Sequence, residues 1–160
     1  AEKFKARECS KIILTRPIVA ADEDMGYLPG EMERKMEPWI RPMMDVFEAH
    51  MTRNQLENAV RVEPLGFMRG RTFNDAFIIG DEMQNCTPNQ MKMLLTRIGE
   101  NSKMVVMGDL KQSDLTNRKN GLADLVHKLK GNEFEYVEHV MMHDEDILRH
   151  LAVAEILKIY

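Results

Sequence analysis

Residues 76–82 read AFIIGDE, and this stretch is the strongest indication of the fold of the 160-residue chain. A short apolar run ends in two adjacent acids, Asp81 and Glu82, and a helix signal follows at Thr87-Pro88. A buried strand of a parallel sheet delivers acids in this way to its carboxyl end, where α/β proteins bind ligands. At such a position one carboxylate can hold a magnesium ion, and the other can orient or deprotonate a water molecule.

Apolar runs and helix signals alternate on both sides of this stretch. Residues 3–9 are predicted to be the end of a helix, and further helices are predicted over 87–99, 122–129 and from 144 to the end. Residues 31–51 are predicted to form two helical pieces, because Pro38 and Pro42 interrupt the pattern. Thr87 is a favourable N-cap with Pro88 in the first turn. Further strands are predicted at 11–15, 59–65, 104–107 and 135–140. This alternation predicts an α/β fold, with a mostly parallel sheet covered by helices on both faces.

The composition is that of a single globular domain covering residues 1–160. Hydrophobic residues make up 44% and charged residues 30% of the chain, and no apolar run approaches the roughly 20 residues that span a bilayer. Cys9 and Cys86 lack metal-ligand spacing, and residues 1–11 are charged throughout, so we expect reduced thiols in the cytoplasm and no membrane association. The net charge of −4 means that nucleic acid would have to be bound by local arginines.

A second polar cluster follows the predicted strand 104–107. Gly108, Asp109 and Gln112 stand directly after this apolar run. Because the carboxyl ends of parallel strands meet at one edge of a sheet, these residues are expected to converge with Asp81 and Glu82. A glutamine there could bind a phosphate oxygen or an attacking water. The alternative is a polar turn that Asp109 caps.

Four arginines are candidates for phosphate contacts. Arg16 ends the first strand, Arg69 and Arg71 lie in a small basic loop, and Arg149 lies in the last predicted helix. Each could contact the phosphates of a nucleotide or of a nucleic-acid backbone. The alternative for each is a surface arginine in a turn or paired with a carboxylate of its own surface.

Taken together, these segments resemble the PhoH family of P-loop NTPases. The matching stretches run in family order along nearly the whole chain: ILTRP (13–17), GYLPG (26–30), EPWIRPMMD (37–45), EPLGFMRGRTFNDAFIIGDEMQN (63–85), TPNQMKMLLTRIG (87–99), SKMVVMGDLKQSDL (102–115), NGLADL (120–125) and DILRH (146–150). The run MRGRTFNDAFIIGDEMQN is long and specific enough to make coincidence a poor explanation.

The resemblance implies a three-layer P-loop NTPase fold and an ATPase related to superfamily 1 helicases. Asp81 and Glu82 match the Walker B acids, which would hold magnesium and activate water, and Gly108, Asp109 and Gln112 match the helicase-like GDxxQ motif. Arg149 matches a late arginine that would stabilise transferred charge, in its own subunit or a neighbour's. Arg16, with Arg69 and Arg71, would face nucleic acid.

The resemblance also implies the cofactors, partners and setting. ATP and Mg2+ are the expected cofactors, and RNA or single-stranded DNA is the expected partner. A homo-oligomer such as a hexameric ring is expected, in the cytoplasm of a bacterial or phage-infected cell. The family is linked to phosphate starvation.

One motif of the family does not occur in these 160 residues. No GxxxxGK[ST] phosphate loop is present, and from the family order we expect it roughly ten residues before Ala1, in the strand–loop–helix arrangement of this motif. We therefore expect the 160 residues alone to be inactive as an ATPase. The alternative is a degenerate copy that serves as a non-catalytic nucleic-acid-binding or assembly module.

Overall fold

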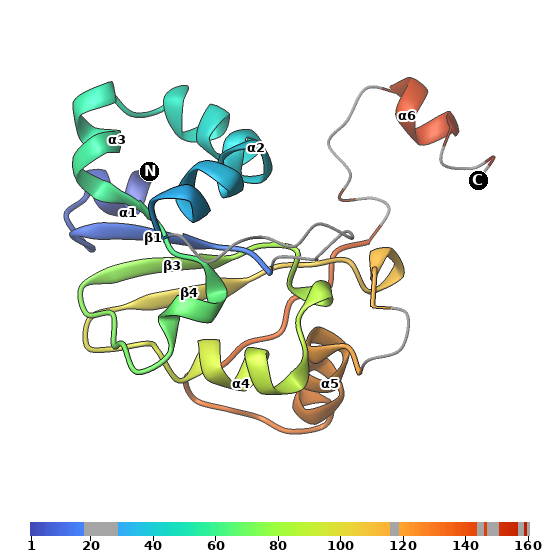
Figure 1. Cartoon of the computed structure of the whole chain (residues 1–160). Helices are drawn as coiled ribbons and strands as arrows, with labels where there is room; N and C mark the ends of the chain where they lie inside the picture. The colour runs from blue at the N-terminus through green and yellow to red at the C-terminus, as the bar shows by residue number, and fades with distance from the viewer. Residues whose placement is uncertain (18–28, 116–118, 144–145, 147–150, 157–158, 160) are drawn as a thin grey trace. The chain divides into compact units, whose positions relative to one another are not determined.

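The computed structural model describes residues 1–17, 29–115, 119–143, 146, 151–156 and 159 (Figure 1). They form two compact units, residues 1–128 and 129–160, each of which is considered by itself. In the described part of the chain, no helix is long and apolar enough to cross a membrane.

The first unit is built on a four-stranded parallel sheet. Its strands are β1 (Lys11–Thr15), β2 (Val60–Val62), β3 (Ala76–Gly80) and β4 (Lys103–Val106), in the order β2-β1-β3-β4. Thr15 lies opposite Gly80, and Gly80 lies opposite Val106. The strands β1, β3 and β4 therefore end side by side, and the predicted α/β fold with a parallel sheet is confirmed. The arrangement is consistent with a P-loop NTPase-like fold.

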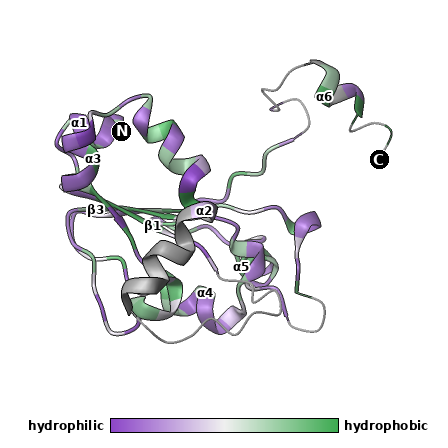
Figure 2. Cartoon of the chain, turned by 45° about the horizontal axis from the view of Figure 1, so that its top comes forward, coloured by the Kyte–Doolittle hydropathy of each residue, from purple (hydrophilic) through white to green (hydrophobic). Residues whose placement is uncertain are grey.

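Helices cover both faces of this sheet (Figure 1). One core cluster joins Ile12 and Leu14 of β1 to Ile40 and Leu56, and the other joins Ile13 and Ile78 to Leu94 and Leu122. Alternate residues of one strand thus enter opposite layers. The helices are α1 (Glu2–Lys5), α2 (Pro29–Glu48), α3 (Arg53–Ala59), α4 (Pro88–Leu95) and α5 (Gly121–Leu129). Hydrophilic and hydrophobic residues both occur along α4 and α5 (Figure 2), as expected for helices with one face on a core.

The helix α4 begins as predicted. Thr87 and Gln90 form a capping box, and Pro88 stands in the first turn. The side-chain oxygen of Thr87 accepts a hydrogen bond from the backbone N–H of Gln90 at 3.3 Å. Such a cap stabilises a helix by roughly 1 kcal/mol.

The prediction of two helical pieces over 31–51 was wrong. One continuous helix, α2, contains both Pro38 and Pro42. A proline removes one backbone donor, but a helix that packs an apolar face can tolerate this loss. Ile40 is 2% exposed, and Phe47 packs against the same core cluster.

Two predicted strands also differ from the structure. Over 59–65 only Val60–Val62 is strand, because α3 continues to Ala59 and a 3-10 turn, η1, covers Leu65–Met68. The helix α3 was not predicted, although Thr52 and Gln55 form a capping box that marks its start. In the second unit, residues 135–140 form no strand. The described part of the last helix is α6 (Leu151–Ile156).

Candidate functional site

The two acids that follow β3 lie at the carboxyl edge of the sheet. The backbone N–H of Asp81 donates to the carbonyl oxygen of Thr15 at 3.0 Å, which ties the end of β3 to the end of β1. Glu82 then adopts the left-handed conformation, with φ 51° and ψ 36°. A residue with a Cβ rarely takes this conformation, and such strained residues cluster at functional sites. Asp81 and Glu82 therefore lie just beyond Thr15 and Gly80, the last paired residues of β1 and β3.

Arg16 lies close to both acids. One of its guanidinium nitrogens is 3.9 Å from a carboxylate oxygen of Asp81, and another is 4.0 Å from one of Glu82. Burial, followed by the charge of Glu82, raises the pKa of Asp81 above its ordinary value, while Arg16 acts in the opposite direction. The ionised form of Asp81 is therefore unfavourable in the folded protein, and a cation bound beside it would stabilise that form.

The polar cluster after β4 lies beside these acids, as predicted. The backbone N–H of Met107 donates to the Gly80 carbonyl at 2.7 Å, and that of Met83 donates to the Met107 carbonyl at 2.9 Å. Asp109 caps the 3-10 turn η3 (Leu110–Gln112). The side-chain amide of Gln112 donates to the Asp109 carboxylate at 2.9 Å. The two turns that follow β3 and β4 are thus joined by hydrogen bonds.

Two residues that the sequence analysis did not single out cross-link these turns. Gln84 and Asn85 lie in the 3-10 turn η2 (Met83–Asn85), and both side chains are buried. The Gln84 amide donates to the Glu82 carboxylate at 2.5 Å and accepts from the Asp109 backbone N–H at 3.2 Å. Asn85 exchanges two hydrogen bonds with Asp114. The only signal in the sequence was a pair of amides one residue after the two acids, with Met83 between them.

Gly108 packs directly against the Gln84 side chain of the other turn. A Cβ at this position would meet the Gln84 side-chain oxygen and would lie 2.8 Å from a methyl group of Leu122. The glycine is therefore required by the crowding of the β4 turn against Gln84, and its expected place beside Asp109 and Gln112 is observed.

The predicted arginines that the structure describes, Arg16, Arg69 and Arg71, differ in their surroundings. Arg71 makes a bidentate ion pair with Glu63 and stacks 4.8 Å above the centre of the Phe73 ring. Arg69 is exposed just after η1. Arg149 lies outside the described residues. Arg16 is the predicted arginine that the structure brings to the two acids.

The acids suit a magnesium ion that arrives with a nucleotide. Among the described residues, no group of three or more His, Cys, Asp or Glu side chains converges as a metal cage. Magnesium usually takes one or two protein carboxylates, with water and substrate phosphates completing an octahedron. Asp81, with Glu82 beside it, fits that role. A cation would neutralise the negative charge of these two neighbouring carboxylates, one of which is partly buried.

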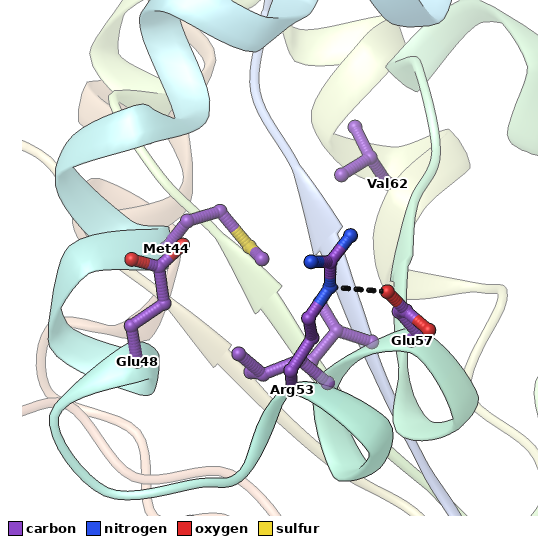
Figure 3. Close-up of a pocket in the computed structure, with 7 residues that line it drawn as sticks. Met44, Glu48, Arg53, Glu57 and Val62 are labelled. Atoms are coloured by element: carbon purple, nitrogen blue, oxygen red, sulfur yellow. Dashed lines mark hydrogen bonds and ion pairs between the residues drawn. The ribbon is translucent and has the colours of Figure 1, made fainter.

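A separate pocket of about 290 Å³ lies on the α2–α3 side of the sheet (Figure 3). Its lining residues are Met44, Glu48, Arg53, Leu56, Glu57, Val60 and Val62. Arg53 and Glu57 form an ion pair at 2.8 Å. None of the predicted site residues lines this pocket, so it does not mark the candidate site.

Comparisons with known proteins find matches along nearly the whole chain. The family described as "PhoH-like protein" matches residues 1–160. The chain is 44% identical to the PhoH-like protein of Bacillus subtilis (strain 168), over 98% of the chain and 50% of that protein. It is 42% identical to the PhoH-like protein of Synechocystis sp., over 96% of the chain and 48% of that protein. Identity to Protein PhoH of Escherichia coli (strain K12) is 39%, over 100% of the chain and 47% of that protein. The chain thus spans about half the length of the curated relatives it matches.

Proposed function

Because this chain belongs to the PhoH-like protein family, we propose that it is part of an ATP-hydrolysing, helicase-like protein that acts on RNA or single-stranded nucleic acid. In this proposal the chain supplies the acids that bind magnesium and activate water, and the glutamine that contacts phosphate. The proposal concerns the longer protein, since the chain covers about half of its relatives.

The observation that supports this proposal most directly is the convergence of two strand-end turns. One turn carries Asp81 and Glu82, and the other carries Asp109 and Gln112. Hydrogen bonds between the two turns fix their separation. An arrangement of two acids and a glutamine at the carboxyl edge of a parallel sheet is suited to phosphoryl transfer, which needs a cation holder, an oriented water and a group that contacts phosphate.

Each of these residues has a distinct part in the proposed reaction. Asp81 would hold Mg2+, which supplies charge neutralisation to the phosphate oxygens when it is bound with ATP. Glu82 would orient the attacking water and accept its proton. Gln112 would contact the terminal phosphate, with its amide oriented by the Asp109 carboxylate.

The nucleic-acid surface and the assembly are also part of the proposal. Exposed Arg69 can offer charge to a phosphate backbone, whereas Arg16 lies beside Asp81 and Glu82, and Arg71 is paired with Glu63. We propose a homo-oligomer, such as a hexameric ring, in which Arg149 contacts the ATP of its own or a neighbouring subunit. The expected setting is the cytoplasm.

The decisive test is hydrolysis by the full-length protein, including any residues that precede Ala1. Glu82→Gln should leave the affinity for ATP with magnesium within about threefold of wild type. It should slow hydrolysis by about a hundredfold or more, because a general base typically accelerates a reaction by about 10²–10⁴-fold. Asp81→Ala should also weaken magnesium-dependent ATP binding.

The outcome separates the two interpretations of the sequence. Equal and small effects of both substitutions would show that the acids are structural. If the full-length protein binds single-stranded RNA or DNA but neither binds nor hydrolyses ATP, the chain is the non-catalytic module considered above.

A further inference from the structure

Gln84 has more polar contacts than its place in a short turn requires. Its side chain is 0% exposed, and among the described residues only Thr15 and Asn85 are other buried polar residues. Burying an amide is unfavourable unless each of its groups finds a hydrogen-bond partner. The partners of Gln84 come from both turns of the candidate site.

The contacts of Gln84 fix the orientation of its amide. The amide nitrogen donates to a carboxylate oxygen of Glu82 at 2.5 Å and to the backbone carbonyl of Gln112 at 3.3 Å. The amide oxygen accepts from the backbone N–H of Asp109 at 3.2 Å. A flipped amide would set a donor against the Asp109 N–H and an acceptor against two acceptors, so only one orientation satisfies the network.

Contacts to the backbone of Gln84 and the space left by a neighbouring glycine also fix the position of this residue. The hydroxyl of Ser113 donates to the Gln84 backbone carbonyl at 3.2 Å. Gly108 leaves the space that the Gln84 amide oxygen occupies. No other side chain of this length supplies two donors and an acceptor: glutamate would repel Glu82, and methionine would fill the space without the hydrogen bonds.

We propose that Gln84 is a positioning residue that couples the carboxylate of Glu82 to the turn carrying Asp109 and Gln112. A displacement of the Glu82 carboxylate moves the amide of Gln84, and the amide moves the backbone of Asp109, whose carboxylate orients the Gln112 amide. The connection itself is independent of catalysis. Its use, to let the water-activating group and the phosphate-contacting group respond together, rests on the proposed function.

The test follows the backbone amide of Asp109 by hydrogen exchange in the 160-residue chain. Glu82→Asn shortens the side chain out of reach of Gln84, and asparagine tolerates the left-handed conformation of this position. Exchange at Asp109 should become about fivefold faster, which is the effect of losing a hydrogen bond worth about 1 kcal/mol. In a Gln84→Met background, Glu82→Asn should add no further change at Asp109.

Asn85→Ala is the matched control. It removes a second buried amide from η2 and breaks the bonds to Asp114 without touching Glu82. Exchange at Asp114 should then become faster, while exchange at Asp109 stays within twofold of wild type. A general loosening of the turns would instead accelerate both amides in every variant.

A second readout uses the full-length protein. Gln84→Met should lower kcat for ATP hydrolysis about tenfold or more with little change in KM, because the geometry of reaction is disturbed and the binding of ATP is not. Asn85→Ala should lower kcat less.

The outcomes keep this inference separate from the proposed function. If exchange at Asp109 does not respond to Glu82→Asn, the coupling is absent, whatever the protein hydrolyses. That single variant decides the question even if Gln84→Met does not fold. If Asp109 does respond but the full-length protein shows no ATP hydrolysis, the coupling stands and the proposed function fails.

Discussion

Asp81 and Glu82 are adjacent carboxylates that lie near the same guanidinium. Arg16 is 3.9 Å from one and 4.0 Å from the other, distances at the long limit of an ion pair. The attraction does not fully offset the burial of Asp81, whose pKa is raised. The ionised form of Asp81 therefore lowers the stability of the fold.

Asp81→Asn should stabilise the chain at neutral pH in the absence of Mg2+. A carboxyl whose pKa is raised by folding binds its proton more tightly in the folded state, so its ionisation lowers stability as the pH rises above the ordinary range of aspartate. Thermal unfolding should show a higher Tm for the variant at pH 7 and a difference that shrinks as the pH falls toward about 3.8, the ordinary aspartate pKa, and is lost below it. A constant difference at all pH values would assign it to packing instead.

The two arginines of the basic loop should separate folding from binding. Arg71→Ala should lower the stability by about 1–2 kcal/mol, because a bidentate pair with the mostly buried Glu63 is lost. Arg69→Ala should change stability by less than about 0.5 kcal/mol and weaken binding of single-stranded RNA or DNA. Affinity measured at two salt concentrations, with denaturant unfolding of each variant, checks both expectations. Normal stability of Arg71→Ala together with lost affinity would return Arg71 to the nucleic-acid surface.

At the scale of elements, the site depends on how closely two turns approach. The turn after β3 and the turn after β4 share backbone and side-chain hydrogen bonds, and α5 begins against them, with the Gly121 N–H donating to the Cys86 carbonyl at 2.7 Å. Burial raises the pKa of the Cys86 thiol to about 12. Cys86 is fully buried at this junction, in the core cluster that also contains Leu122.

Gly108→Ala tests this packing. The added methyl group would lie 2.8 Å from Leu122 and would press on the Gln84 amide, so the free energy of unfolding should fall by about 1–3 kcal/mol. Gly66→Ala is the control, because nothing lies within 4 Å of a Cβ at that position. Denaturant unfolding of the two variants gives the comparison. Equal effects would mean that Gly108 is not closely packed.

At the scale of the whole molecule, the net charge of −4 makes long-range attraction of nucleic acid weak. The proposed binding would then depend on local arginines and should weaken as the salt concentration rises. Completion of an ATP site by a neighbouring subunit would fit a chain that offers acids on one edge of its sheet and carries a family-matched arginine at residue 149.

Mixing two inactive variants of the full-length protein tests this arrangement. Arg149→Ala should abolish most hydrolysis, since an arginine finger can be worth about a thousandfold or more in rate, while Tm stays nearly unchanged. Mixed oligomers of Arg149→Ala and Glu82→Gln should regain part of the activity, because one interface pairs an intact Glu82 with an intact Arg149. Mixed oligomers without recovery would place Arg149 within its own subunit.

The elements whose signals are local could be predicted from the sequence. The apolar run before Asp81 predicted β3, the Thr87 cap predicted α4, and the alternation of strands and helices predicted a parallel sheet that brings Gln112 to the edge carrying Asp81. These predictions succeeded because periodicity and capping act over a few neighbouring residues.

Features that depend on partners distant in the sequence became visible in the folded chain alone. Core packing keeps α2 continuous through Pro38 and Pro42, and residues 135–140 form no strand although their pattern is suitable. Arg71 is occupied by Glu63, and Gln84 joins two turns that lie 25 residues apart in the chain. A hydrogen bond or ion pair of this kind needs a partner that the fold brings near, and no local pattern specifies which partner that is.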